Sequence, residues 1–322
     1  MKKENLLRIR NLSVDYKVKE GYLSAVHGVS FDIRKGEIFA IVGESGCGKS
    51  TIAHTILRLL PNHNEKIGGE INFQDQNLNA LSEKELEAVR GHKIGMIFQN
   101  PLESLNPVYA VGKQVQEGLL LDNISKTDAW NTVVNLFKDV QMQDAEKRAR
   151  SFPHELSGGM RQRVMIAMML GRNPELLIAD EPTTALDVTV EAQILRVIKQ
   201  LRDDRNMAVM LITHNFGLVA EVADMVGVMY AGEMVETGTV YEIFDNPKHP
   251  YTTQLMKALP HITKKEGKLE TIRGAVPKMI NHEKGCRFEN RCTYATEKCW
   301  TEDPPVHHLS ETHSFRCFRE EV

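Results

Sequence analysis

The stretch GESGCGKS at residues 43–50 constrains the fold of this chain more than any other feature. It fits the pattern G-x-x-x-x-G-K-[ST], follows the apolar run EIFAIVG (37–43), and precedes the apolar-periodic TIAHTILRLL (51–60). This pattern binds phosphate when a strand leads into it and a helix follows it. The glycines let backbone N–H groups close around an anion, and the helix N-terminus adds its positive dipole end. The sequence therefore predicts a nucleoside-triphosphate site.

Within this loop, we expect Lys49 to reach the β- and γ-phosphates and Ser50 to ligate Mg²⁺. Cys47 occupies a variable position of the pattern, and we interpret it as a small side chain that faces outward rather than as a catalytic thiol. The loop residues predicted to contact the nucleotide are Gly43, Ser45, Gly46, Cys47, Gly48, Lys49, Ser50 and Thr51.

Three further apolar runs predict buried strands: LLIAD (176–180), VMLIT (209–213) and MVGVMY (225–230). Continuous rather than alternating apolar strands indicate a sheet that is covered on both faces. Amphipathic helical stripes occur within 127–140 and 194–201. Strands that alternate with helices predict an α/β fold with a mostly parallel sheet.

The chain divides by composition near residue 260. Residues 100–170 carry no clear strand pattern and predict a helical subdomain inside a domain that spans residues 1–260. Residues 261–322 are rich in charge, His, Pro and Cys without periodicity, which predicts a small irregular C-terminal extension. No stretch approaches the roughly 18 apolar residues of a membrane span, and residues 1–10 lack the apolar region of a signal peptide.

Two carboxylates at the end of the run LLIADEP (176–182) predict the second half of a triphosphatase site. We expect Asp180 to hold Mg²⁺ and Glu181 to polarise the attacking water. Phosphoryl transfer depends on positioned charge more than on covalent chemistry, so these two residues and Lys49 form the core of the predicted site.

The segment ELSGGMRQRVMIAMML (155–170) resembles the signature motif of ATP-binding cassette (ABC) proteins, with Met160 where the common form has Gln. Ser157 is placed to cap an apolar helix, and Gly158 and Gly159 let its first N–H groups approach an anion. The resemblance implies that this helix end faces the γ-phosphate held by a second ABC ATPase subunit, identical or paralogous, in a head-to-tail dimer.

Other residues resemble the remaining motifs of the family, and the resemblance covers roughly residues 6–245. It implies that Gln99 senses the γ-phosphate and Mg²⁺, that Asp187 ends the D-loop TALD (184–187), and that His214 contacts the γ-phosphate. Glu181, His214 and Gln99 are thus the expected catalytic residues. Tyr16 resembles the residue that stacks on adenine, and Tyr22 is an alternative for this role.

Four segments resemble the oligopeptide and dipeptide importer branch, which also includes nickel systems: QNPLESLNPV (99–108), KHPYTTQL (248–255), ETIRGAVP (270–277) and the cysteine tail that contains GCRFENRCTYATEKCW (285–300). The branch implies two transmembrane permease subunits, an extracytoplasmic solute-binding protein, and a location at the cytoplasmic face of the membrane. The alternative is a non-transport ABC ATPase acting on nucleic acid or the ribosome. The single cassette and the formal net charge of −3 argue against it and against a nucleic-acid partner.

Four cysteines gather in the extension: Cys286, Cys292, Cys299 and Cys317. In a reducing compartment such a group indicates metal ligands or reactive thiols rather than disulfides. The gaps between these cysteines are wider than the pairs typical of zinc sites. Four thiolates can hold a [4Fe–4S] cluster, and similar tails in this importer branch are associated with one. A mixed Cys/His zinc site and a site without metal are the alternatives.

Overall fold

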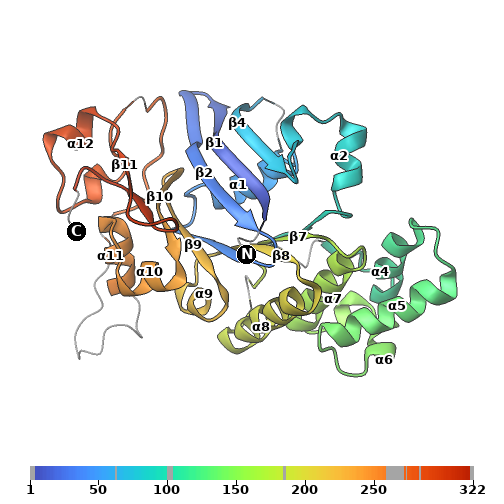
Figure 1. Ribbon diagram of the computed structural model, residues 1–322. Coiled ribbons are helices and arrows are strands. Elements are labelled where there is room, and N and C mark those ends of the chain that lie inside the picture. Colours follow the sequence, from blue (N-terminus) through green and yellow to red (C-terminus); the bar gives the residue numbers. More distant parts are fainter. Residues whose placement is uncertain are drawn as a thin grey trace. The chain divides into compact units, whose positions relative to one another are not determined.

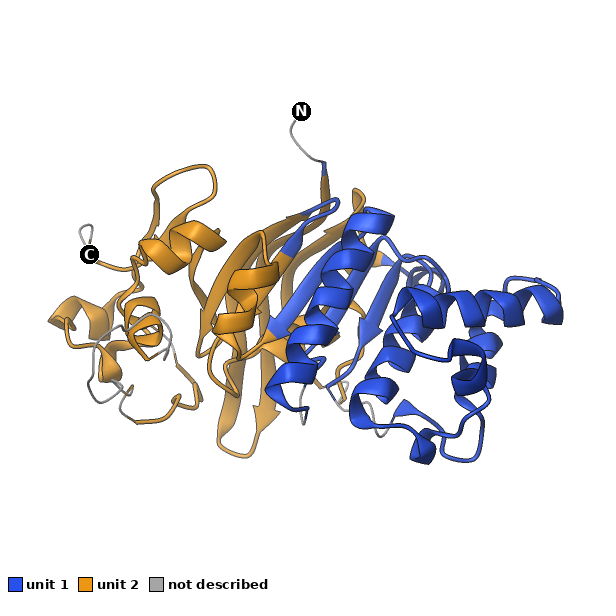
Figure 2. Cartoon of the chain, turned by 90° about the horizontal axis from the view of Figure 1, so that it is seen from below, with its two compact units in different colours: residues 1–4, 34–38, 81–212 blue, residues 5–33, 39–80, 213–322 orange. Residues whose placement is uncertain are grey.

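The computed structural model describes residues 4–61, 64–99, 104–183, 186–258, 272, 274–282 and 284–319 (Figure 1). They form two compact units (Figure 2). Unit 1 comprises residues 1–4, 34–38 and 81–212, and unit 2 comprises residues 5–33, 39–80 and 213–322. Within the described ranges, no helix is both long enough and apolar enough to cross a membrane.

The strands of unit 1 are parallel and fully buried. β6 (Ile94–Ile97) pairs with β7 (Leu176–Asp180), which pairs in turn with β8 (Ala208–Thr213). All three are runs of apolar residues, as expected of strands covered on both faces. The predicted strands at 176–180 and 209–213 and the parallel α/β class are confirmed.

The described helices of unit 1 are α2 (Glu83–Val89), α4 (Val111–Leu120), α5 (Lys126–Asp139), α6 (Ala145–Ala149), α7 (Gly158–Leu170) and α8 (Val188–Arg205), with a 3₁₀ turn at Pro153–Glu155. Ser125 caps α5 by accepting the Asp128 N–H, and the predicted stripe buries Val133 and Phe137. The described part of 100–170 is helical, without strands, and Figure 1 shows α4 to α7 gathered together.

Unit 2 contains the strand that leads into the phosphate loop. β3 (Ile38–Val42) runs parallel to β9 (Met225–Tyr230), and β9 pairs with β10 (Glu233–Thr239) in antiparallel fashion. Outside the extension, its described helices are α1 (Lys49–Ile56), α9 (Phe216–Val222), α10 (Val240–Asp245) and α11 (Pro250–Lys257). The predicted strand at 225–230 is confirmed.

A second sheet of unit 2 did not follow from the apolar runs. It has the order β2-β1-β4-β5, with β1 (Asn5–Val18), β2 (Gly21–Arg34), β4 (Lys66–Phe73) and β5 (Gln76–Asn77), followed by a 3₁₀ turn at Leu78–Ala80. β1 buries Leu7 and Ile9 and then Leu12 and Val14. Asn11 has φ 53°, and the register with β4 shifts around it. This bulge interrupts the period of two that identifies a strand in a sequence.

The extension belongs to unit 2. It holds a 3₁₀ turn, η3 (Glu289–Arg291), the short helix α12 (Glu297–Thr301), and the hairpin β11 (Val306–His308) and β12 (Ser314–Arg316), whose β12 pairs with β10. The predicted domain boundary near residue 260 falls in 259–271, outside the described residues. Residues 100–103, 184–185, 270–271 and 273 of the predicted motifs also lie outside them.

Candidate nucleotide site and cysteine site

The phosphate loop of unit 2 depends on glycines where other backbone comes close. A Cβ at Gly43 would lie 2.2 Å from the Met229 carbonyl oxygen, and one at Gly48 would lie 2.2 Å from that of Ala25. Gly48 also has φ 100°, a conformation that disfavours side chains. Only glycine therefore fits at either end of the loop, and α1 begins directly after it at Lys49.

Lys49 closes the loop onto itself. Its side chain is buried, and Nζ donates to the carbonyl oxygens of Gly43 at 2.8 Å and Glu44 at 3.0 Å. The ammonium group is therefore held inside the ring of backbone that the sequence predicts for phosphate. Ser50 and Thr51 follow in the first turn of α1.

Our expectation that Cys47 faces outward is wrong. Its side chain is 1% exposed, and Sγ lies 3.9 Å from Lys49 Nζ. Sγ occupies space that the missing side chain of Gly43 leaves open, because a Cβ there would lie 2.9 Å from it. Burial raises the pKa of the Cys47 thiol. Cys47 is therefore a neutral thiol that packs against the backbone of the phosphate loop.

The two candidate adenine-stacking tyrosines differ in their surroundings. Tyr16 makes a side-chain hydrogen bond to Thr51, directly after the phosphate loop, and burial raises its pKa. Tyr22 lies under Lys66, whose Nζ is 3.9 Å from the ring centroid, and its N–H donates to Asn281. Tyr16 is thus the tyrosine that adjoins the loop helix. His214 is exposed and directly precedes Asn215, which caps α9.

Unit 1 brings together two of the predicted catalytic residues. Gln99 Nε2 donates to Glu181 Oε2 at 2.9 Å. Glu181 has φ 44°, and its N–H donates to the Ile212 carbonyl oxygen at 2.9 Å. A left-handed conformation is unfavourable for a residue other than glycine and persists where neighbouring contacts fix it. Asp180, at the end of β7, is buried.

The signature residues of unit 1 begin α7 beside the start of α8. Ser157 caps α7 by accepting the Met160 N–H at 3.3 Å, and Asp187 caps α8 by accepting the Val190 N–H at 3.0 Å. A Cβ at Gly159 would lie 2.6 Å from Val190 Cγ1, and one at Gly158 would lie 3.0 Å from Leu186. The two glycines therefore let the two helix ends approach closely.

The four cysteines of the extension line one cavity of about 210 Å³ in unit 2. Each thiol accepts a backbone N–H: Cys286 from Phe288, Cys292 from Tyr294 at 3.4 Å, Cys299 from Thr296 at 3.5 Å, and Cys317 from Arg319 at 3.4 Å. Burial raises the pKa of Cys286 to about 12 and also raises the pKa values of Cys292 and Cys317. Without a metal, these three thiols are therefore neutral at pH 7.

A buried carboxylate that the sequence does not single out joins the extension to the rest of unit 2. Glu236 on β10 accepts from the N–H groups of Lys248 at 2.7 Å and His249 at 2.8 Å, and its Oε1 lies 2.8 Å from His313 Nε2. Its side chain has no exposed surface. A lone Glu in a strand carries no signal for such a role, because its three partners come from two distant segments.

Two family profiles match the chain. The first is "ABC transporter" over residues 26–184, and the second is "Oligopeptide/dipeptide transporter, C-terminal region" over residues 235–299. The oligopeptide transport ATP-binding protein OppD of Bacillus subtilis is 49% identical over 96% of this chain and 87% of its own length. The dipeptide transport ATP-binding protein DppD of Lactococcus lactis is 44% identical over 97% and 90%.

Solved structures agree with these matches. A dimeric ATP-binding cassette bound to ADP and Pi, MJ0796, matches with a TM-score of 0.65 and 28% identity over 73% of this chain and 99% of that one. CbiO1 of Clostridium perfringens matches with a TM-score of 0.66 and 27% identity over 81% and 98%. The fold and the phosphate loop define a P-loop ATPase. The chain belongs to the ABC transporter family, in the branch with the oligopeptide/dipeptide transporter C-terminal region.

Proposed function

We propose that this chain is the ATP-binding and ATP-hydrolysing subunit of an ABC importer for dipeptides, oligopeptides or similar small cargo such as nickel. The observation that carries this proposal is the 49% identity to an oligopeptide transport ATP-binding protein over 96% of the chain. The match of residues 235–299 to the transporter's C-terminal region supports it independently of the ATPase motifs.

The loop of unit 2 binds the triphosphate. Lys49 exchanges the carbonyl oxygens of Gly43 and Glu44, which it now contacts, for β- and γ-phosphate oxygens. Ser50, Asp180 and Gln99 are the residues that would hold Mg²⁺, which neutralises charge on the phosphates when bound. Tyr16, hydrogen-bonded to Thr51, is placed to stack on adenine.

Glu181 of unit 1 is the general base in this proposal. Gln99 holds the Glu181 carboxylate by a hydrogen bond of 2.9 Å, which orients it toward an attacking water. His214 of unit 2 contacts the γ-phosphate in this proposal. Ser157, Gly158 and Gly159, with Asp187, face the nucleotide of a second ATPase subunit. The similarity to a dimeric cassette bound to ADP and Pi supports that arrangement.

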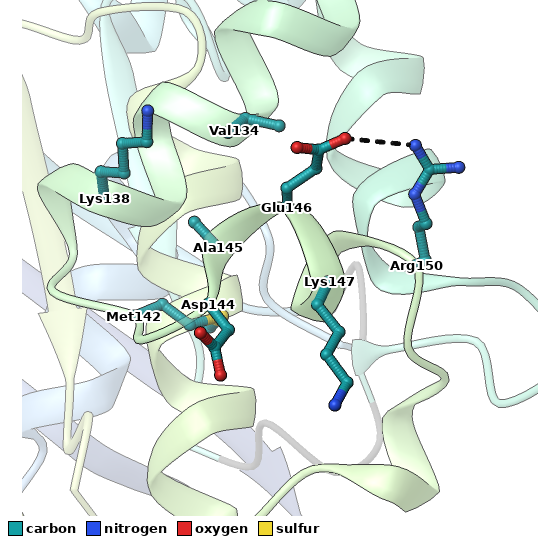
Figure 3. Close-up of a pocket in the computed structure, with 8 residues that line it drawn as sticks. All are labelled: Val134, Lys138, Met142, Asp144, Ala145, Glu146, Lys147 and Arg150. Atoms are coloured by element: carbon teal, nitrogen blue, oxygen red, sulfur yellow. Dashed lines mark hydrogen bonds and ion pairs between the residues drawn. The ribbon is translucent and has the colours of Figure 1, made fainter.

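We assign permease docking to the helical subdomain of unit 1, which places the chain at the cytoplasmic face of the membrane. α5, α6 and the loop between them line an open pocket of about 900 Å³ (Figure 3). Its charged side chains are Lys138, Asp144, Glu146, Lys147 and Arg150, and Glu146 pairs with Arg150 at 3.4 Å. Mixed charges around a hollow suit a polar cytoplasmic segment of a permease. A solute-binding protein then acts indirectly, through the two permeases.

Uptake of labelled peptide by cells tests the function. Deletion of the gene is expected to abolish uptake of a radiolabelled tripeptide, and the wild-type allele is expected to restore it. The Lys49→Ala allele should not restore uptake, because its phosphate loop lacks the cation. The Arg10→Gln allele, altered in an ion pair between β1 and β2, is the matched control and should restore it. Unchanged uptake of tripeptide, dipeptide and nickel after deletion would contradict the proposal.

We propose a [4Fe–4S] cluster as the occupant of the cavity that the four cysteines line. The described residues contain no group of three or more His, Cys, Asp or Glu that could hold a single metal ion. Four thiolates can hold a [4Fe–4S] cluster, and all four cysteines of the extension line this one cavity. A backbone N–H donates to each of the four sulfurs, and hydrogen bonds of this kind stabilise thiolate ligands of a cluster.

Anaerobic purification tests the occupant. The proposal predicts a brown chain with iron and acid-labile sulfide in equal amounts, about four of each per chain. A Cys292→Ser variant should lose most of both, whereas Cys47→Ser, altered outside the cavity, should retain them. A colourless chain with one zinc would contradict the cluster without affecting the ATPase proposal.

A further inference from the structure

The segment between the first two cysteines of the extension contacts the phosphate loop. Arg291, the last residue of η3, donates from Nη1 to Glu44 Oε1 at 2.9 Å and from Nη2 to Glu44 Oε2 at 3.2 Å. Glu44 is the second residue of the loop. The Arg291 side chain is 6% exposed and that of Glu44 is 29% exposed, so the pair is largely shielded from water. Paired, charge-assisted hydrogen bonds of this kind fix orientation as well as distance.

Glu44 is held on every side. Its N–H donates to the Tyr251 hydroxyl at 3.2 Å, and its carbonyl oxygen accepts from Lys49 Nζ at 3.0 Å and from the Cys47 N–H at 3.3 Å. Its carboxylate accepts two hydrogen bonds from Arg291, and its side chain also makes a hydrogen bond with the Tyr251 hydroxyl. Fixing the carboxylate therefore fixes the turn of backbone from which Lys49 must be released to reach phosphate.

Arg287 connects residues 286–292 to the phosphate loop through a second set of contacts, with Ala231 and Ser24. Its guanidinium is buried and donates to the Ala231 carbonyl oxygen at 2.6 Å and to Ser24 Oγ at 3.0 Å. The next residue, Gly232, donates its N–H to the Cys47 carbonyl oxygen at 2.9 Å. Phe288 packs edge-on against Tyr230 with ring centroids 5.0 Å apart. Residues 286–292 are thus connected to the phosphate loop in two ways: directly through Arg291 and Glu44, and indirectly through Arg287 and the backbone of residues 231–232.

We infer that Arg291 is a positioning residue of the phosphate loop, through which residues 286–292 of the cysteine extension set the affinity for ATP. The inference rests on the proposed function, because it takes ATP as the ligand of residues 43–50. Its physical basis is charge: without Arg291, the Glu44 carboxylate loses its ion-pair partner beside a loop that must accept a triphosphate. Like charges repel, and an unpaired carboxylate is also freer to move.

The test is binding of fluorescent MANT-ATP with Mg²⁺ to the full chain purified anaerobically. Arg291→Gln should raise the Kd about fivefold to tenfold while changing hydrolysis at saturating ATP less than about twofold. Arg291→Gln with Glu44→Gln should return the Kd to within about twofold of Glu44→Gln alone, because the repelling charge is gone. A merely structural role for Arg291 predicts no such rescue.

Arg10→Gln is the matched control, because it breaks another paired Arg–carboxylate contact in unit 2, with Asp32, and should leave the Kd unchanged. If Arg291→Gln does not fold, Arg291→Lys is used in its place. This variant keeps the positive charge but loses the paired hydrogen bonds to Glu44, so it should raise the Kd for MANT-ATP about twofold or more. Wild-type affinity in a folded Arg291 variant, or a double variant no tighter than Arg291→Gln, overturns the inference. Equal binding by wild type and Lys49→Ala would instead overturn the proposed function.

Discussion

Replacing Gly159 by Ala tests how the signature helix is seated. The added Cβ would lie 2.6 Å from Val190 Cγ1, well inside van der Waals contact. Val190 lies in the first turn of α8, and a valine in a helix has one strongly preferred rotamer, so it moves aside only at a cost. Overpacking costs about 1–3 kcal/mol, against about 0.5–1 kcal/mol gained when Ala replaces Gly in a helix. We expect a net loss of about 1–2 kcal/mol in the free energy of unfolding.

Urea denaturation followed by tryptophan fluorescence measures this loss. The chain has two tryptophans, and Trp300→Phe leaves Trp130 on α5 as the only reporter, within unit 1. Gly118→Ala in α4 is the matched control, because nothing lies within 4 Å of a Cβ there. It should stabilise the unit by about 0.4–1 kcal/mol.

A second substitution isolates the contact. In a Val190→Ala background the Cγ1 atom is gone, so Gly159→Ala should become neutral or slightly stabilising, by about 0.5 kcal/mol. If Gly159→Ala stabilises the chain as much as Gly118→Ala does, α7 and α8 do not begin in the close contact described here. An equal loss with and without Val190 would also refute the reasoning.

Two further predictions concern buried groups of unit 2. Glu236→Ala leaves the N–H groups of Lys248 and His249 and the His313 ring without their acceptor, which should lower the free energy of unfolding by about 2–4 kcal/mol. Urea unfolding followed by Trp300 fluorescence in a Trp130→Phe background checks this. A loss of stability no larger than that caused by Glu70→Ala, at an exposed position, would contradict it. Cys47 should resist alkylation by iodoacetamide at pH 8 in the native chain and should react after the chain is denatured, since the thiol is buried and burial raises its pKa. Mass spectrometry detects the alkylated cysteine. Rapid labelling of the native chain would contradict the prediction, because it would show that the thiol faces solvent.

The sequence predicts the parallel part of the fold well, because the physical signal there is local. β7 and β9 coincide with the apolar runs at 176–180 and 225–230, and β8 differs from its run by one residue. The antiparallel sheet of unit 2 was missed, since the bulge at Asn11 breaks the alternation of β1. The hairpin β11–β12 is three residues per strand and depends on pairing with β10, which no local pattern encodes.

The candidate site also has parts that the sequence predicts and parts that it does not. Glycine spacing and strand ends predict the phosphate loop and the Asp180–Glu181 pair, because backbone geometry dictates those residue types. The Gln99–Glu181 hydrogen bond joins two residues that the sequence predicts to be catalytic. Glu44 and Arg291 are 247 positions apart, and nothing in either neighbourhood marks them as partners. The orientation of Cys47 depends on space beside Gly43, which a sequence pattern does not contain.

Binding and hydrolysis of radiolabelled ATP by the full chain and two variants tests the central claim, that this is the ATPase of a transporter. The wild-type chain should bind and hydrolyse ATP, and Lys49→Ala should do neither. Glu181→Gln should bind ATP but hydrolyse it about 100-fold more slowly or worse, because it keeps the loop and loses the base. Wild-type binding by Lys49→Ala would contradict the site, and wild-type turnover by Glu181→Gln would contradict the assignment of the base.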